Sequence, residues 1–246
     1  MSVAINVTWR KLQTNNTERL AFMLPEKHKV FIDFCIGDGY IADTKKGYFL
    51  QMQHSIKQRE YLLHKVTILQ EYGFNPSFKE EYRENSYGKY FVKSVCYTKQ
   101  AKTAHKYLYN SNIKTIDASL LRVLDRKSLA YWFMDDGCVD HYNKVRTGNI
   151  LYTYETPFAR SYRFATQSFT TDENKLIQAW LQERFSITAS INYQKGKPFI
   201  SISQKPSKDA FKHIIEDYII DTMHYKIQYP HSLVGIPYEK CNTVRD

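Results

Sequence analysis

The chain has 246 residues, of which 43% are hydrophobic and 24% are charged, and these proportions are typical of a globular protein with a sizeable core. No apolar run approaches the ~18 residues of a membrane helix, so we expect no membrane partner. The 35 basic and 25 acidic residues leave a net charge of +10, which favours a polyanionic partner such as nucleic acid, since basic side chains release the counterions condensed on phosphates; solubility alone is the other explanation.

The N-terminal extension, residues 1–27, is polar and lacks the apolar core of a secretory signal. Arg10 and Lys11 leave a mitochondrial presequence open. The four cysteines are far apart and the eight histidines form neither HExxH nor HxH, a pattern that predicts no zinc site, no disulfide framework and no histidine-based metal site. Reduced thiols indicate an intracellular protein; an organelle (mitochondrion or chloroplast) and a bacterial or phage cytoplasm both stay open.

An apolar segment closed by Asp-Gly occurs twice, at residues 30–39 and 128–137. Its acidic residues, Asp38 and Asp136, are 98 residues apart. Each segment is predicted to form a buried helix, and a glycine directly after the aspartate is typical of a helix C-terminus. The two copies indicate an internally duplicated chain.

The segments downstream of the two motifs also correspond. We place Gln53 and Gln167 in equivalent strands, 114 residues apart, so that the second copy carries 16 extra residues within 142–157. A helix, a second strand pair and a third helix then come next in both copies. The expected elements are strands at 48–53 and 162–167, helices at 59–72 and 172–185, strand pairs at 78–81 with 90–97 and 189–193 with 199–203, and helices at 101–109 and 208–220.

Both copies close on a lysine, Lys114 in the first and Lys226 in the second. The sequence therefore predicts an α+β fold made of two αββαββα halves related by a pseudo-twofold axis. The motif helices lie at the interface, and two antiparallel sheets form a saddle. The expected segments are the extension at 1–27, the first half at 28–116, a linker at 117–127, the second half at 128–230 and a C-terminal tail at 231–246.

Asp38 and Asp136 are expected to meet where the motif helices pack together. Two carboxylates a few ångströms apart repel each other, and a divalent cation removes that cost. Mg²⁺ prefers carboxylate and water ligands and is completed by the phosphate oxygens of a substrate, so the centre favours phosphodiester hydrolysis. Lys114 and Lys226 are candidates for stabilising charge on the phosphate or ordering the attacking water.

The β-hairpins are candidates for DNA contacts, because a two-stranded ribbon fits the major groove. Two equivalent sheets would cover one half-site each. An ordinary exposed position is the alternative explanation for each candidate residue. The candidates are Gln53, Gln167, Lys45, Lys46, Lys144, Arg146, Lys195 and Lys197.

The two Asp-Gly segments, Phe31–Gly39 and Leu129–Gly137, resemble the paired motifs of LAGLIDADG homing endonucleases, and in particular the single-chain, two-motif subgroup that includes the yeast mitochondrial omega-intron enzyme. The resemblance covers residues 28–230 approximately. It implies a monomer that cleaves a long, asymmetric double-stranded DNA site with Mg²⁺, leaving short 3′ overhangs, with Mn²⁺ able to substitute. The role would be the spread of a mobile intron or intein.

The resemblance also assigns roles within the motifs. Asp38 and Asp136 match the metal-binding aspartates, Lys114 and Lys226 match the active-site lysines, and the backbone carbonyls of Gly37 and Asp135 are further metal contacts. Asp136 is chosen over its neighbour because, like Asp38, it directly precedes glycine.

The chain departs from the motif at its third residue, which is small in the family and is Asp33 and Tyr131 here. We expect a different helix seam at that end, with Asp33 in a structural, hydrogen-bonded role. Two other functions stay open: an RNA maturase that binds its intron RNA, and a DNA-binding regulator without catalysis. The retained aspartates and lysines favour cleavage.

Overall fold

The computed structural model describes residues 24–45, 47–82, 90–140, 142–147, 150–155 and 159–227, of which 90, 142–147 and 150–155 are described by their backbone alone. Most of the expected N-terminal extension and the expected tail at 231–246 lie outside these residues. Within the described ranges, no helix is long and apolar enough to span a membrane.

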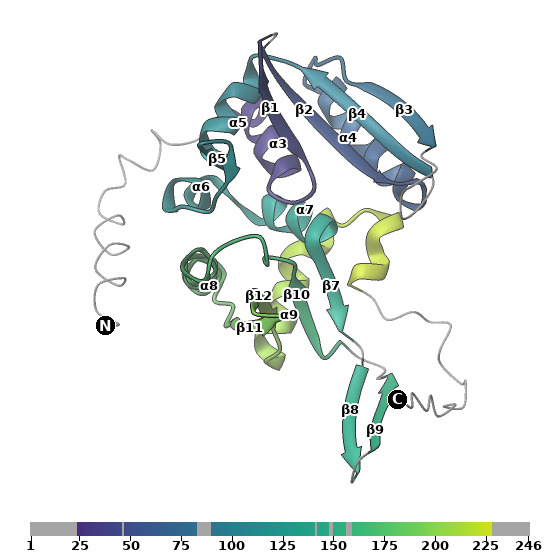
Figure 1. Cartoon of the computed structure of the whole chain (residues 1–246), viewed down its shortest axis with the longest axis vertical. Helices are drawn as coiled ribbons and strands as arrows, with labels where there is room; N and C mark the ends of the chain where they lie inside the picture. Colours follow the sequence, from purple (N-terminus) through teal and green to yellow (C-terminus); the bar gives the residue numbers. More distant parts are fainter. Residues whose placement is uncertain are drawn as a thin grey trace.

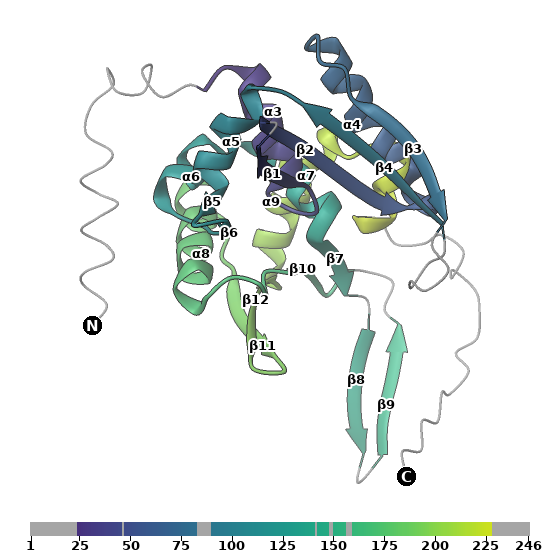
Figure 2. The same ribbon diagram turned by 45° about the horizontal axis from the view of Figure 1, so that its top comes forward.

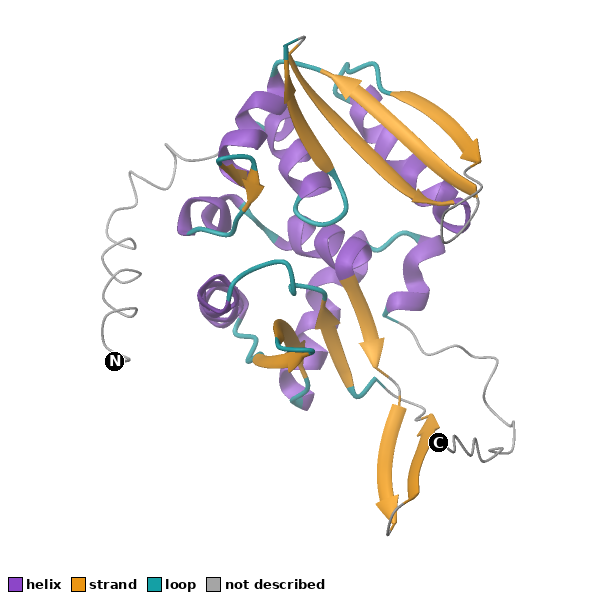
Figure 3. Cartoon of the chain, viewed as in Figure 1, coloured by secondary structure: helices purple, strands orange, loops and turns teal. Residues whose placement is uncertain are grey.

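The first half is built from one antiparallel sheet with helices on one of its faces (Figures 1 and 3). The strand order is β1-β2-β4-β3, so the second hairpin pairs with the first through β4. Its elements are α3 (Glu26–Cys35), β1 (Tyr40–Thr44), β2 (Gly47–Ser55), the short η1 (Ile56–Gln58), α4 (Arg59–Glu71), β3 (Ser77–Tyr82), β4 (Tyr90–Tyr97) and α5 (Gln100–Leu108).

The second half repeats this order around a sheet β11-β12-β10-β7. Its main elements are α7 (Arg126–Asp136), β7 (Gly137–Asp140), β10 (Ser161–Phe164), α8 (Thr171–Phe185), β11 (Ser190–Gln194), β12 (Lys197–Ile202) and α9 (Lys205–Ile215). The duplicated αββαββα fold is therefore confirmed. Between the halves lie β5 (Tyr109–Asn110), β6 (Ile113–Lys114) and α6 (Ala118–Val123), and η2 (Glu216–Tyr218) and η3 (Asp221–Lys226) follow α9.

The extra residues of the second copy form a hairpin of their own, β8 (Tyr142–Thr147) with β9 (Ile150–Glu155). This hairpin projects away from both sheets (Figure 2). It pairs with neither four-stranded sheet and forms a separate two-stranded unit.

Strand pairing fixes which residues of the two halves are equivalent. Tyr40 lies two residues after Asp38 and pairs with Gln51; Cys138 lies two residues after Asp136 and pairs with Arg163. Gln51 and Arg163 are 112 residues apart, so the extra segment is 14 residues long, the excess over the motif offset of 98. The predicted equivalence of Gln53 and Gln167 is wrong, because β10 ends at Phe164 and Gln167 lies in the turn beyond it.

The boundaries of two later helices also differ from expectation. α8 begins one residue early, because Thr170 caps it and forms a reciprocal capping box with Glu173. α9 begins at Lys205 with Pro206 in its first turn, where a missing N–H costs nothing, and ends at Ile215.

The motif helices α3 and α7 pack against each other at the centre of the molecule. The side chains from Lys29 to Cys35 and from Ser128 to Met134 are all buried. In the second half, Phe133 of α7 makes edge-on ring contacts with Phe164 and Phe211, with centroids 5.0 to 5.3 Å away. The motif helices are thus core elements of both halves and fix the position of everything attached to their C-terminal ends.

The opposite ends of the two helices are joined by a buried polar cluster. The Lys29 ammonium lies 3.0 Å from both carboxylate oxygens of Asp33 on α3 and 3.1 Å from Asp125, the N-cap of α7. Ser128 donates a hydrogen bond to Asp33 (2.6 Å). The expected hydrogen-bonded position of Asp33 is confirmed: its carboxylate is 1% exposed and joins the two halves.

Removing the cation from this cluster will destabilise the fold. In Lys29→Met, Asp33 remains buried without its charge partner, and we expect a loss of about 3 kcal/mol in the free energy of unfolding. The double variant Lys29→Met/Asp33→Leu should regain most of it, because no buried charge remains. Urea denaturation followed by circular dichroism measures both, and a single variant as stable as the parent would contradict this account.

Candidate active site at the ends of the motif helices

Both motif aspartates lie where a motif helix passes into its sheet. α3 ends at Cys35 and Asp38 lies in the turn before β1, whereas Asp136 is the last residue of α7. Neither following glycine has the positive φ expected of a helix-ending glycine. A Cβ on Gly39 would lie 2.0 Å from the Phe34 carbonyl oxygen, and one on Gly137 2.1 Å from the Phe133 ring. Glycine is required there by close packing.

Asp135 occupies the contact between the two helices. It faces Gly37, its counterpart 98 residues earlier, and a Cβ added to Gly37 would lie 2.4 Å from the Asp135 Cβ. Its Oδ1 accepts hydrogen bonds from Lys65 (2.7 Å) and Tyr61 (2.8 Å) of α4, and its Oδ2 accepts one from the Asp38 backbone N–H (3.2 Å). The Asp135 side chain is fully buried and tied to the first half.

Asp38 and Asp136 are the less constrained carboxylates of the centre. Burial, followed by repulsion from Asp135, raises the pKa of Asp38. Burial, followed by the charges of Asp38 and Asp135, raises the pKa of Asp136 to about 7. Both groups therefore hold a proton more tightly than a free carboxylate, and a cation that replaces the proton relieves the repulsion.

The two predicted lysines make corresponding contacts. Lys114, on β6, donates to the carbonyls of Gly37 (2.7 Å), Cys35 (2.6 Å) and Gly39 (3.0 Å). Lys226, at the end of η3, donates to the Asp135 carbonyl (3.0 Å). Gly37 and Asp135 are counterparts, and the lysines are separated by the same 112 residues as Gln51 and Arg163. Each motif carbonyl predicted to contact metal thus accepts a hydrogen bond from a lysine of its own half. Burial lowers the pKa of Lys226.

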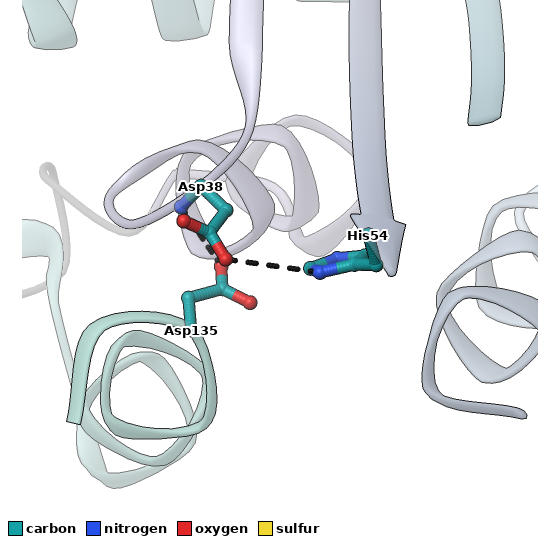
Figure 4. A group of neighbouring side chains, drawn as sticks. All are labelled: Asp38, His54 and Asp135. Atoms are coloured by element: carbon teal, nitrogen blue, oxygen red, sulfur yellow. Dashed lines mark hydrogen bonds and ion pairs between the residues drawn. The ribbon is translucent and has the colours of Figure 1, made fainter. Parts of the chain in front are cut away.

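His54 is a residue that the sequence reasoning missed. It lies on β2, and its Nδ1 is 3.7 Å from Asp38 Oδ2 (Figure 4). Burial, assisted by the Lys65 charge, lowers the pKa of His54 to about 4, so the ring is neutral at neutral pH. The alternation of buried and less buried side chains along β2 could have identified it, because this pattern places His54 on the buried face with Leu50 and Met52.

The donors at this centre suit a divalent cation. Ligand atoms of Asp38, His54 and Asp135 all lie within 4.8 Å of one another. Carboxylate oxygens are the ligands that Mg²⁺ and Mn²⁺ prefer, and imidazole is acceptable to Mn²⁺. Asp136, which the sequence predicted to share this centre with Asp38, is not a member of the group; it lies near enough for the charges of Asp38 and Asp135 to add to burial in raising its pKa.

The predicted DNA contacts lie apart from this centre. Gln53 is half-buried on the outer face of β2, Gln167 is half-buried in its turn, and the exposed Lys45, Lys195 and Lys197 lie at hairpin turns. Lys46 lies outside the described residues, as do the side chains of Lys144 and Arg146 on β8. Gln51 and Arg163, which the sequence analysis did not single out, are counterparts on the half-exposed outer faces next to the two motifs.

The chain is similar to several known proteins. The model of the LAGLIDADG DNA endonuclease family matches residues 28–209. A probable intron-encoded endonuclease of Wickerhamomyces canadensis is 31% identical over 209 residues, which cover 82% of this chain and 84% of that protein. A probable intron-encoded DNA endonuclease of Mycosarcoma maydis is 32% identical over 117 residues, 46% of this chain and 72% of that protein.

Among solved structures, the homing endonuclease I-WcaI bound to its DNA recognition sequence superposes with a TM-score of 0.66. The two sequences are 27% identical, and the superposition covers 83% of this chain and 86% of the other.

The raised pKa values predict an unusual dependence of stability on pH. A carboxyl with a raised folded pKa destabilises the fold above that pKa, and the penalty shrinks as pH falls. In EDTA, lowering the pH from 8 to 6.5 should stabilise the parent by about 1 kcal/mol relative to Asp136→Asn. Below about pH 6.5 the unfolded chain binds a proton at His54 more readily than the folded protein does. The lowered pKa of His54 therefore reduces stability as the pH falls further. Thermal melts of both proteins test this, and parallel pH profiles would refute the electrostatic assignment.

Proposed function

The chain belongs to the LAGLIDADG DNA endonuclease family, and we propose that it cuts both strands of a long, asymmetric double-stranded DNA site with divalent metal, Mg²⁺ or Mn²⁺, as a monomer. Residues 28–116 and 128–230 each supply one catalytic compartment, and short 3′ overhangs result. The observation that carries this proposal is the repeated arrangement at the motif ends: an aspartate next to a carbonyl that accepts from a lysine, partly buried in the first half and buried in the second.

In this mechanism Asp38 and Asp136 bind the metal, with the carbonyls of Gly37 and Asp135 beside them. Bound metal supplies Lewis acidity and a water of lowered pKa. Lys114 and Lys226 orient the attacking water or stabilise charge on the phosphate, because their ammonium groups are held by carbonyls next to the metal ligands. The Asp135 carboxylate, already bonded to Lys65 and Tyr61, holds the two helix ends together.

The outer faces of the two sheets form the DNA-binding saddle in this proposal. The net charge of +10 supports it, because much of the affinity for DNA comes from phosphate neutralisation. Exposed hairpin lysines meet phosphates, and outward side chains such as Gln51, Gln53 and Arg163 read base edges. Arg163 lies over the Phe199 ring, 4.4 Å from its centroid, which holds its guanidinium in place.

The relatives named as intron-encoded endonucleases support a similar setting for this protein, namely the cutting of alleles that lack its intron. The protein then acts inside the compartment that holds the intron's genome. Assistance in RNA splicing and catalytically inactive DNA binding are the competing functions, and both make metal-dependent cutting dispensable.

Loss of a motif aspartate should separate cutting from binding. Incubated with a randomised double-stranded DNA library and Mg²⁺, the parent should enrich one long site with defined ends. On that site, Asp38→Asn and Asp136→Asn should cut at least about 100-fold more slowly, because a metal ligand is lost, while salt-sensitive DNA binding persists. Asp172→Asn, at an 87% exposed position, is the matched control.

Wild-type cutting by either motif variant would remove these residues from catalysis. Binding without metal-dependent cutting by the parent would identify a regulator. Tight binding to a structured intron RNA, with no cutting, would identify a maturase.

The lysines should act on separate strands. Because Lys114 and Lys226 contact different motifs, replacing one by Met should slow one strand by about 100-fold and spare the other. Supercoiled plasmid would then accumulate as the nicked circle, and strand-specific labels would reveal opposite strands for the two variants. Lys102→Met, an exposed lysine on α5, should cut like the parent. Equal slowing of both strands by each variant would argue against one lysine per strand.

A further inference from the structure

The pseudo-twofold symmetry is broken beside the motif aspartates. The offset of 112 residues set by strand pairing makes Thr166 the counterpart of His54. Thr166 donates to Asn174 Oδ1 (2.6 Å) and accepts from the Ile200 N–H (3.1 Å). Its hydroxyl is therefore satisfied within its own half.

His54 lacks a comparable pair of partners. Its side chain is 1% exposed, and its Nε2 accepts and donates no hydrogen bond to the described residues. Its Nδ1 faces Asp38 Oδ2 at 3.7 Å, which is too long for a hydrogen bond, and a contact with Gln58 affects its pKa less than burial does. A buried polar group without a partner destabilises the fold, so each such group calls for an explanation, such as a bound ion or a catalytic role.

The His54 ring points toward the carboxylates of Asp38 and Asp135 (Figure 4). The Tyr61 ring lies 5.1 Å from it, centroid to centroid, and the Tyr61 hydroxyl is committed to Asp135. The Lys65 ammonium is likewise committed to Asp135. Asp135 receives three hydrogen bonds, so it retains one of the roughly four acceptor positions of a carboxylate. Asp38 and His54 face each other, and Asp135 offers a third ligand atom nearby.

We propose that His54 is a metal ligand of the compartment around Asp38, so that this compartment binds its cation through nitrogen and oxygen, whereas the compartment around Asp136 offers oxygen alone. This inference deepens the proposed function and rests on it. Imidazole favours Mn²⁺ and later transition metals over Mg²⁺. The two compartments, and hence the two DNA strands, then differ in their metal preference.

The test uses the full chain and Mn²⁺ without DNA, so that it does not depend on a site selected by cutting. Electron spin echo spectroscopy of bound Mn²⁺ should show ¹⁴N coupling in the parent. Protein grown with ¹⁵N-histidine should lose the ¹⁴N signal and show ¹⁵N coupling, a check that needs no substitution. In His54→Gln the nitrogen coupling should vanish, and the Mn²⁺ Kd should rise at least about tenfold, with a smaller change for Mg²⁺. Thr166→Val, at the counterpart position, should keep the coupling and the Mn²⁺ Kd.

Absence of histidine coupling in the parent, or its persistence in His54→Gln, would overturn the assignment. An unchanged Mn²⁺ Kd in a His54→Gln protein with parental circular dichroism would do the same. The two proposals fail separately. A parent that cuts DNA without histidine coupling would refute only the His54 ligand, and a parent with histidine-bound Mn²⁺ that never cuts would refute only the nuclease.

Discussion

The whole arrangement depends on the close approach of the motif helices where Gly37 faces Asp135. A Cβ on Gly37 would lie 2.4 Å from the Asp135 Cβ, so any larger residue would push the two helix ends apart. The two catalytic candidates, Asp38 and Asp136, directly follow Gly37 and Asp135 in the chain. A shift of about 1 Å there is enough to impair catalysis that depends on positioning. The contact explains why the helices are so thoroughly buried, since rigid core elements must hold it.

Three carboxylates, those of Asp38, Asp135 and Asp136, lie near this contact. They differ in how their negative charge is neutralised. Asp135 is bonded to Lys65 and Tyr61, so its charge is compensated within the protein. The charges of nearby lysines offset burial and repulsion only in part at Asp38 and Asp136, and the pKa of each is raised. Lys114 and Lys226 are directed to backbone carbonyls and not to these carboxylates. A cation bound near Asp38 and Asp136 would relieve the repulsion that remains.

Sequence alone predicted the repeated fold and the elements around it, because apolar periodicity and the Asp-Gly repeat are local signals. It failed where pairing between strands decides the outcome. Gln53 and Gln167 looked equivalent by composition, but register makes Gln53 the counterpart of Ala165. His54 belongs to no metal-binding motif, and only the path of β2 past Asp38 brings it into the centre. The anchoring of Asp135 by α4 is likewise a contact between residues 70 apart, which no local pattern reveals.

Fusion of the two halves in one chain is what permits this centre. A symmetric dimer must present the same residue on both sides of its axis. Two glycines there would leave no acceptor for Lys65 and Tyr61, and two aspartates would overlap at their Cβ atoms and place two charges in contact. The single chain instead carries one glycine and one aspartate. Because Gly37 and Asp135 differ, the residues around them are free to differ between the halves. Lys65 and Tyr61 of the first half donate hydrogen bonds to Asp135, and the position of His54 is occupied in the second half by the fully hydrogen-bonded Thr166. The β8–β9 hairpin belongs to the second half. The two compartments are thus unequal because the residues packed against each other at the pseudo-twofold axis, Gly37 and Asp135, are different.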